Sequence, residues 1–482
     1  MNIREKQQGL ALLILVALLT GAIATVAIEA LNRGNDQTAR DRITEAALAY
    51  AKDALIGYAI TYGDTHQAQV HGYLPCPDQA GGNPEGSAEP TCGSQDVSQL
   101  GRLPWRTLDL GALRGADGEC LWYAVSGNYK NNPKTGLMNW DTNGQIRIYD
   151  SDGSLLTPAD NQAVAVIFSP GMASSGQNRS GSAATVCGGN YTASNYLDAA
   201  GGFDNALISS IAGAISQFRM GDHTRTGDRL VFITRQDIWN ALKKRSNFFS
   251  TLETMTRKTA ECIANFGTRN SIDGVVDPTN MGLPWPAPLS ISDYSDNVNY
   301  DDAINLFAGR APYKVNNSRT AAGNTIASDL LLTSGTCNAG TCINNCPNPT
   351  DWAYLYYPWW NNWKDHLFYG IAQEYKPANH PTLPCGNCLS VNNAGQYAAV
   401  VIFANRKLSG QTRASSATDP ARGIASNYLE GSNALNIANL TASGIENYQI
   451  SAESSTFNDI LYCIRQDLTV VKGNPASTPA CP

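Results

Sequence analysis

The sequence predicts an α+β fold with one N-terminal transmembrane helix followed by two tandem modules, each a helix packed on an antiparallel sheet. The first observation is an almost unbroken apolar run from Leu10 to Leu31. As a helix this run reaches about 33 Å, which is enough to span a bilayer. The second is a helical spacing of apolar residues over 43–62. The third is that the body of the chain repeats its signals in the same order.

The composition is that of an exported, loop-rich protein with more than one domain. The chain has 482 residues, of which 16% are charged, and a net charge of −7. This length can bury two or more cores. No basic stripe accompanies the acidic balance, so a nucleic-acid partner is not expected.

The two modules are defined by paired segments. We expect a leader at 1–9, an N-terminal helix at 10–62, a first module at 63–240, and a second module at 250–482 with an insertion at about 293–350. Helical patterns at 43–62 and 252–266 open the two modules. The pairs that follow are Gly72–Pro77 with Gly282–Pro286, Pro104–Trp105 with Pro358–Trp359, Leu121–Lys130 with Leu367–Lys376, Val164–Phe168 with Ala399–Phe403, Ser175–Arg179 with Ser409–Arg413, Asn195–Leu197 with Asn427–Leu429, and Arg235–Asp237 with Arg465–Asp467.

The central strand of each module is predicted by an unbroken apolar run. Val164–Phe168 and Ala399–Phe403 have no polar alternation. Such a strand is buried on both faces, in the middle of its sheet.

Twelve cysteines in an exported body indicate disulfides. Plausible pairs are Cys76 with Cys92 and Cys463 with Cys481, the second closing a C-terminal loop; the remaining connectivity stays open. Zinc is the alternative for a later cluster, but Cys342 and Cys346 do not form a CxxC frame, so disulfides are favoured. The cluster is Cys337, Cys342, Cys346, Cys385 and Cys388.

The repeated polar residues could bind an anion or could be structural. An Arg fork that joins strand ends to loop carbonyls would recur wherever the fold recurs, and we favour this explanation. No catalytic motif is present, and the histidines do not match between modules, so no enzyme is expected. The repeated residues are Gln177, Arg179, Gln411, Arg413, Arg235, Asp237, Arg465 and Asp467.

Two further features suggest ligands. Asp150 and Asp152 place side-chain oxygens at alternate positions, as in calcium loops, although a plain Asx turn has the same pattern. No other cofactor is expected. Trp359, Trp360 and Trp363 lie in an aromatic segment that would suit a glycan or a protein surface if exposed, the alternative being core packing.

The N-terminus resembles that of the type IV pilin and type II secretion pseudopilin superfamily. A polar leader with Arg4 and Lys6 ends at Gly9, and the apolar run begins at Leu10. The resemblance implies cleavage between Gly9 and Leu10 by prepilin peptidase, and a retained apolar helix. It also implies an inner-membrane protein with a periplasmic head that joins other pilin subunits in a cell-surface filament.

Ile14 departs from the family pattern, which has Glu at this fifth position of the mature chain. Minor, tip-associated members lack the Glu in the same way, so the resemblance implies a minor subunit that primes assembly, adheres or binds a partner. Pilus and secretion pseudopilus stay open. The alternative is a membrane-anchored periplasmic carbohydrate-binding protein or hydrolase that enters no filament.

Overall fold

The structure is a computed structural model. It describes residues 36–221, 227–269, 281–321, 331–332, 344–377, 379, 381, 383–441 and 443–482. The predicted transmembrane segment, Leu10–Leu31, lies outside these residues, as do Gly9 and Ile14.

The predicted fold class is wrong as stated. Within the described part of the chain, no helix is both long enough and apolar enough to cross a membrane. Neither main sheet is purely antiparallel, because each contains one parallel strand pair. The fold is mixed α/β, with helices and two mixed sheets.

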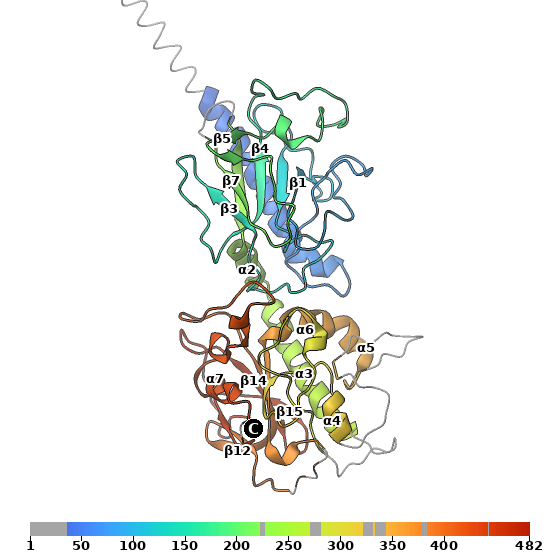
Figure 1. The fold of residues 1–482 in the computed structure, drawn as a ribbon, viewed down its shortest axis with the longest axis vertical. Helices are drawn as coiled ribbons and strands as arrows, with labels where there is room; N and C mark the ends of the chain where they lie inside the picture. Colours follow the sequence, from blue (N-terminus) through green and yellow to red (C-terminus); the bar gives the residue numbers. More distant parts are fainter. Residues whose placement is uncertain are drawn as a thin grey trace, which may run out of the picture.

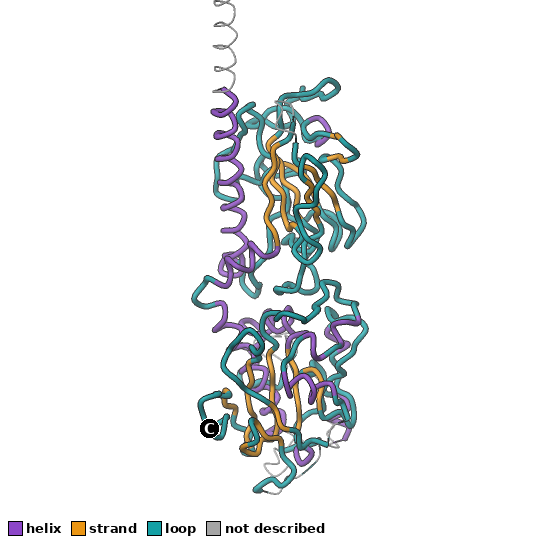
Figure 2. Tube along the Cα trace, turned by 90° about the vertical axis from the view of Figure 1, so that its left-hand side faces the viewer, coloured by secondary structure: helices purple, strands orange, loops and turns teal. Residues whose placement is uncertain are grey.

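The first module is a helix over residues 36–65 packed on a six-stranded sheet. Leu48, Ala51, Leu55 and Ala59 recur at helical spacing and are buried, so one face of the helix packs on the sheet (Figure 2). The strand order is β1-β2-β4-β3-β7, with β8 also paired to β4. The strands are β1 (Gln99–Arg102), β2 (Trp122–Val125), β3 (Ile146–Tyr149), β4 (Ala163–Ser169), β7 (Ser216–Arg219) and β8 (Arg229–Thr234).

The second face of this sheet is covered by the long connection between β4 and β7. Trp122 and Phe168 pack there against Tyr196 and Leu197 of this connection, in a cluster that also includes Phe218 of β7. Every residue of β4 is therefore buried, as its apolar run predicts. The connection contains only short elements, η1 (Ala193–Asn195), β5 (Ala199–Ala200) and β6 (Phe203–Asp204).

Two helices join the modules. α2 (Arg235–Lys243) begins directly after β8 with a capping box, in which Thr234 and Asp237 bond each other's main-chain N–H groups. α3 (Phe248–Arg269) follows after a short turn and is the packing helix of the second module.

The second module has a seven-stranded sheet in the order β13-β11-β12-β10-β9, with β14 paired to both β12 and β15. Its strands are β9 (Ala308–Arg310), β10 (Leu367–Ile371), β11 (Leu389–Val391), β12 (Ala394–Phe403), β13 (Asn447–Tyr448), β14 (Ile460–Arg465) and β15 (Val470–Lys472). Its other helices and helical turns are η2 (Asn297–Asn299), α4 (Asn316–Ala321), α5 (Pro349–Asp351), η3 (Trp352–Tyr356), α6 (Tyr357–Trp363), η4 (Lys364–His366), η5 (Gln373–Tyr375), η6 (Pro420–Gly423), η7 (Ala425–Asn427) and α7 (Gly431–Ala438).

The strand pairings show that the modules share one framework. Gly101 lies opposite Tyr123 between β1 and β2, and Gly309 lies opposite Tyr369 between β9 and β10. The two tyrosine hydroxyls also make matching bonds. Tyr123 donates to the carbonyl of Pro75 at 3.1 Å, and Tyr369 donates to the carbonyl of Pro284 at 3.0 Å.

Two of the sequence pairings and the predicted insertion need correction. Pro104 follows β1, so its counterpart is Pro312 after β9, whereas Pro358 lies in α6. β9 also falls within the predicted insertion, 293–350, although it has a counterpart in β1. The central strands match with a shift of one residue, because Tyr123 faces Ile167 while Tyr369 faces Val401. Similarity of residue types suggests one alignment of these segments, whereas the strand registers of the two sheets give another.

The Arg-Gln-Asp triplets also differ in structure. Arg235–Asp237 is the first turn of α2, whereas Arg465 ends β14 and Asp467 lies in the turn to β15. The first triplet lies where the chain continues into the next module, and the second lies where it reverses.

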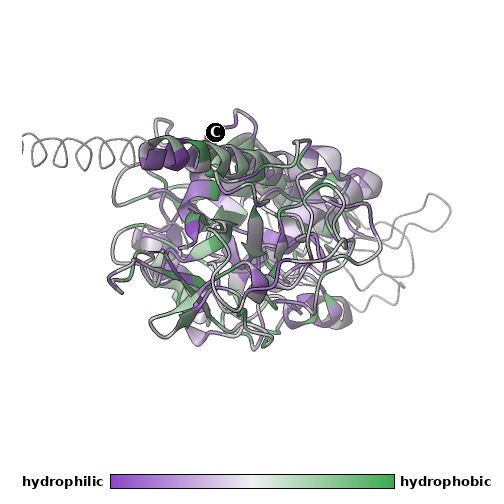
Figure 3. Cartoon of the chain, turned by 90° about the horizontal axis from the view of Figure 1, so that it is seen from above, coloured by the Kyte–Doolittle hydropathy of each residue, from purple (hydrophilic) through white to green (hydrophobic). Residues whose placement is uncertain are grey.

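The modules lie end to end along the long axis of the molecule (Figure 1). The helix at 36–65 begins at the end farthest from the second module and runs toward it (Figures 1 and 2). Its first turns are hydrophilic, as the view along this axis shows (Figure 3).

Disulfides are present in both modules. Cys76 is joined to Cys92 and Cys463 to Cys481, the two pairs put forward from the sequence. The other bonds are Cys120–Cys187, Cys262–Cys346 and Cys385–Cys388. Cys337 and Cys342 lie outside the described residues.

Candidate functional site

The repeated Arg fork, formed by Arg179 in the first module and Arg413 in the second, joins loops to strand ends. The Nε of Arg179 donates to the carbonyl of Asn195 at 2.8 Å, and the Nε of Arg413 donates to that of Asn427 at 2.9 Å. In both copies the guanidinium lies over a tyrosine ring. Both copies therefore bind main-chain and ring groups of their own module.

The glutamine of the signature positions the arginine. Gln177 Oε1 accepts from Arg179 Nη2 at 2.9 Å, and Gln411 Oε1 accepts from Arg413 Nη2 at 3.1 Å. Nη1 donates to a carbonyl in each copy, at 2.9 Å in the first and 2.6 Å in the second. Because Nε, Nη1 and Nη2 all have acceptors, the geometry favours a structural role over anion binding.

The two copies of the fork differ in their carboxylate partner. Arg179 lies 3.3 Å from Glu119 of its own module. Arg413 lies 3.8 Å from Asp141, which belongs to the first module. The second copy of the fork thus receives its counter-charge from outside its own module.

Asp141 is the centre of the junction between the modules. Its side chain is 3% exposed, and its Oδ2 lies 3.2 Å from Nε2 of His366, which has no exposed surface. Burial raises the pKa of Asp141, although Arg413 and Arg422 act in the opposite direction. Burial lowers the pKa of His366 to about 3, so this imidazole is neutral at physiological pH.

A second carboxylate, Asp365, lies beside this pair. Its Oδ2 forms a buried ion pair with Nη1 of Arg422, and its Oδ1 accepts from Asn139 Nδ2 at 3.1 Å. Asn139 also donates to the carbonyl of Asn362 at 2.8 Å. Asn139 is therefore hydrogen-bonded directly to α6 and η4, which lead into β10.

Asp141, Asp365 and His366 offer oxygen and nitrogen atoms within 4.8 Å of one another, which is close enough for a metal ion. The surroundings do not suit a cation, however. Asp365 is already paired with Arg422, and Arg413 faces Asp141. A divalent ion here would be placed among guanidinium groups, so the cluster is best described as a buried ion-pair network.

Trp140 fills the apolar part of the junction. Its ring centroid lies 4.4 Å from that of Trp363 at an angle of 82°, an edge-to-face contact. It also contacts Phe248, His366 and Phe403. An aromatic side chain of the first module is therefore inserted into the core of the second.

Two of the three tryptophans proposed for ligand binding are buried. Trp360 and Trp363 are 0% and 1% exposed, and Trp360 stacks on Tyr313. Trp359 is half-buried against His71 and Phe248. Packing, including packing across the junction, accounts for the extra aromatic residues, and Trp360 and Trp363 have no face free for a sugar ring.

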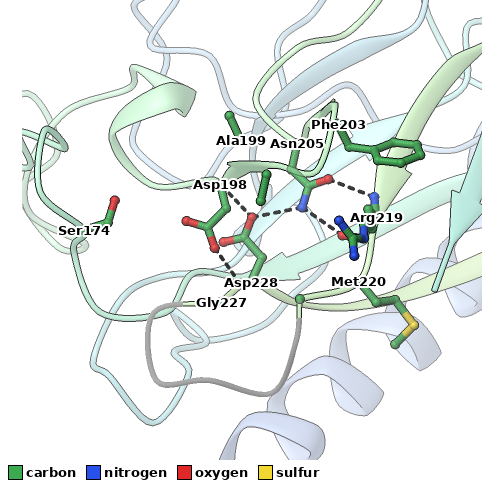
Figure 4. Close-up of a pocket in the computed structure, with 11 residues that line it drawn as sticks. Ser174, Asp198, Ala199, Phe203, Asn205, Arg219, Met220, Gly227 and Asp228 are labelled. Atoms are coloured by element: carbon green, nitrogen blue, oxygen red, sulfur yellow. Dashed lines mark hydrogen bonds between the residues drawn. The ribbon is translucent and has the colours of Figure 1, made fainter. Parts of the chain in front are cut away.

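A second polar feature, absent from the sequence analysis, is the Asp198–Asp228 carboxyl pair beside a cavity of about 300 Å³ (Figure 4). Asp228 Oδ2 accepts from the N–H of Asp198 at 2.7 Å and from Asn205 Nδ2 at 3.1 Å. Asp198 Oδ2 accepts from the N–H of Asp228 at 3.0 Å. Burial, with the nearby charge of Asp198, raises the pKa of Asp228 to about 7.

The same pair recurs in the second module. Asp459 Oδ2 accepts from the N–H of Glu430 at 3.1 Å and from Asn433 Nδ2 at 2.9 Å. Burial, with Glu430, raises the pKa of Asp459 as well. Because the pair recurs at the same place, it belongs to the module framework. The sequence could have indicated this pair, since Asp198 and Glu430 each directly follow the repeated Asn-Tyr-Leu.

The candidate calcium turn has the geometry of an Asx turn. Asp150 Oδ1 accepts from the N–H of Ser151 at 2.7 Å, and Asp152 Oδ1 accepts from the N–H of Ser154 at 2.8 Å. The guanidinium of Arg219 also bonds the carbonyl of Ser151. A cationic side chain therefore already lies on this turn.

The Arg-Gln-Asp residues have separate roles. Arg235 donates to the carbonyl of Trp140 at 3.3 Å, and Asp237 caps α2 and lies 3.5 Å from Lys52. Asp467 Oδ1 accepts from Thr469 Oγ1 at 2.7 Å within the β14–β15 turn. Of the two triplets, the first contributes to the junction, through the bond from Arg235 to Trp140.

A polar cleft of about 610 Å³ also lies between the modules. Amide and hydroxyl side chains line it, together with Asp96 and Asp293, and no lysine or arginine is among its described lining residues. Several of these groups bond one another, as when Ser415 Oγ accepts from the N–H of Asn143 at 3.0 Å.

Comparison of the chain with protein-family models, with curated proteins and with solved structures finds no match.

Proposed function

We propose that this chain is a non-enzymatic minor subunit of the pilin or pseudopilin kind, cleaved after Gly9 and incorporated in or at the tip of a type IV pilus or a type II secretion pseudopilus. Its partners would be prepilin peptidase and other subunits of the filament, which starts at the inner membrane and presents a periplasmic or cell-surface head. Two features of the sequence support this proposal: the leader that ends at Gly9, and the presence of Ile14 where the family pattern has Glu.

The observation that carries the proposal is the direction of the helix at 36–65. This helix begins at the end of the molecule opposite to the second module (Figure 1). A filament joined through the N-terminal segment would therefore hold the first module and leave the second at the far end. That position suits a tip subunit that presents its distal module for adhesion or partner binding.

A structural rather than catalytic role agrees with the chemistry of the repeated groups. The two Arg forks use their donors on loop carbonyls and on glutamine. The two carboxyl pairs bind main-chain N–H groups of their own module. Polar groups that recur in both modules and bond each other have the properties of a scaffold.

The test is the mature N-terminus and location of the chain. Gly9→Val should leave the leader in place and remove the chain from purified filaments, whereas the matched control Gln8→Ala should be processed normally. Mass spectrometry of sheared filaments should find the wild-type chain beginning at Leu10. Unchanged processing of Gly9→Val, or absence of the chain from all filament fractions, would refute the proposal.

The carbohydrate-binding alternative has lost its main support. It depended on exposed aromatic side chains, and Trp360 and Trp363 are buried. We therefore do not propose it as a second function.

A further inference from the structure

β8 in the first module and β14 in the second are equivalent strands. Phe232 lies opposite Val166 in β4, and Cys463 lies opposite Val400 in β12. Both strands directly follow the buried aspartate of a carboxyl pair, Asp228 or Asp459. Residue 232 therefore corresponds to residue 463, and 230 to 461.

The outer edge of β14 is covered by β15. Leu461 accepts from the N–H of Gly473 at 2.9 Å, and Arg465 donates to the carbonyl of Thr469 at 2.8 Å. In an antiparallel pair the N–H and C=O of one residue point to the same side. The main chain of Leu461, Cys463 and Arg465 therefore faces β15, and the residues between them face β12.

The same edge of β8 carries no strand in the described part of the chain, where β8 pairs only with β4. By the correspondence above, the main-chain groups of Leu230, Phe232 and Thr234 point toward this edge. The N–H of Thr234 donates to Asp237 Oδ2 at 2.9 Å as the chain enters α2. Because α2 leads on to the second module, the first module has no returning strand.

We propose that this open edge of β8 is a docking site for an extended segment of a partner polypeptide, added antiparallel as β15 is added to β14. Unpaired strand edges accept such segments through main-chain hydrogen bonds. β8 has the sequence RLVFIT, rich in residues that favour strands. The inference concerns the head alone and does not depend on whether the chain enters a filament.

Charge and shape beside the edge indicate the chemistry of the partner. In the second module, Lys472 of β15 lies 2.8 Å from Glu253 on α3, the packing helix. In the first module, a groove of about 110 Å³ between the packing helix and the start of β8 is lined by Leu48, Leu230 and Glu45, and by Arg229, whose charge is balanced by Asp41 at 2.8 Å. We therefore expect a segment of β-branched residues with a lysine or arginine, such as the Val470-Val471-Lys472 of β15.

The probe is a labelled peptide of residues 468–474, LTVVKGN, added to the full chain. We expect saturable binding by fluorescence anisotropy, with slower hydrogen exchange at the amides of Leu230 and Phe232 and no change in β14. Failure to bind at about 1 mM, or protection at another strand instead of β8, would overturn the proposal.

Two peptide variants test the geometry without altering the protein. Residues 469, 471 and 473 face β14 in the native hairpin, so N-methylation at Val471 should weaken binding at least about tenfold. N-methylation at Val470 is the matched control and should have a much smaller effect. Equal effects at the two positions would contradict strand addition.

Two variants of the protein test the recognition of the lysine. Glu45→Lys should weaken binding of the peptide about threefold, and the control Asp53→Lys, at another exposed site of the helix, should not. Equal binding by both would contradict the lysine recognition.

Discussion

Asp141 of the first module lies 3.2 Å from His366 of the second, and both side chains are buried. His366 stays neutral, because burial lowers its pKa to about 3, so the charge that balances Asp141 comes mainly from Arg413 and Arg422. The junction is therefore an ion-pair network that includes groups from both halves of the chain. A buried charge without its partner is strongly destabilising.

Asp141→Ala should therefore lower the free energy of unfolding by about 3–5 kcal/mol. Its matched control is Glu119→Ala, since Glu119 is the carboxylate partner of the other fork but is 25% exposed. The control should cost about 1 kcal/mol or less. Denaturant unfolding of the two variants measures the difference, and equal losses would contradict the buried network.

Trp140→Ala should uncouple the modules. The side chain fills a space among Trp363, Phe248 and Phe403, so its removal should cost about 3–5 kcal/mol. Calorimetry should then resolve two transitions in place of one, because Trp140 joins the apolar cores of the two modules. Trp105→Ala, which removes a half-buried indole inside the first module, is the control and should keep a single transition. A single transition in both variants would show that the modules stay coupled without Trp140 and would contradict the prediction.

Asp228 should make stability depend on pH. Its pKa in the folded chain is about 7, above the ordinary value of 3.8, so the folded state favours the protonated form. The resulting stabilisation is present below about pH 4 and is lost as the pH rises through 7. Asp228→Asn cannot ionise and should remove on the order of 4 kcal/mol of this dependence. Unfolding free energies between pH 4 and 8 compare the two chains; parallel curves would contradict the raised pKa.

The two forks should respond differently to a conservative change. Lysine cannot bond the three acceptors that a guanidinium reaches. Arg179→Lys should cost about 1–2 kcal/mol, and Arg413→Lys about 3 kcal/mol, because Arg413 also balances Asp141 and its side chain is fully buried. Urea unfolding gives both values. The reverse order would show that the contact with Asp141 contributes little.

Sequence reasoning found the framework where residue type and position together constrain the structure. The apolar run of β4 predicted a central strand, and the repeated Gln and Arg residues predicted a structural fork with matching bonds in both modules. Pairs of cysteines close in sequence were also predictable, as with Cys76 and Cys92. In each case the deciding contacts are local or recur in both copies.

The junction could not be predicted in this way. Asp141 and His366 are far apart in sequence and have no counterparts to align, so no pattern connects them. Density of aromatic residues likewise does not distinguish an exposed binding surface from a buried contact between modules. Trp363 is buried because Trp140 of the other module packs against it. A contact between residues so far apart in sequence leaves no pattern in the sequence.

The carboxylate that faces Arg413 belongs to the other module, so a cut between the modules affects the two forks differently. A fragment that ends after α2 retains Glu119, the partner of its own fork. A fragment that begins at α3 retains Arg413 and His366 but lacks Asp141 and Trp140. Separation of the halves therefore removes junction partners from both, because Asp141 also loses Arg413, but only the distal half loses the counter-charge of its own fork.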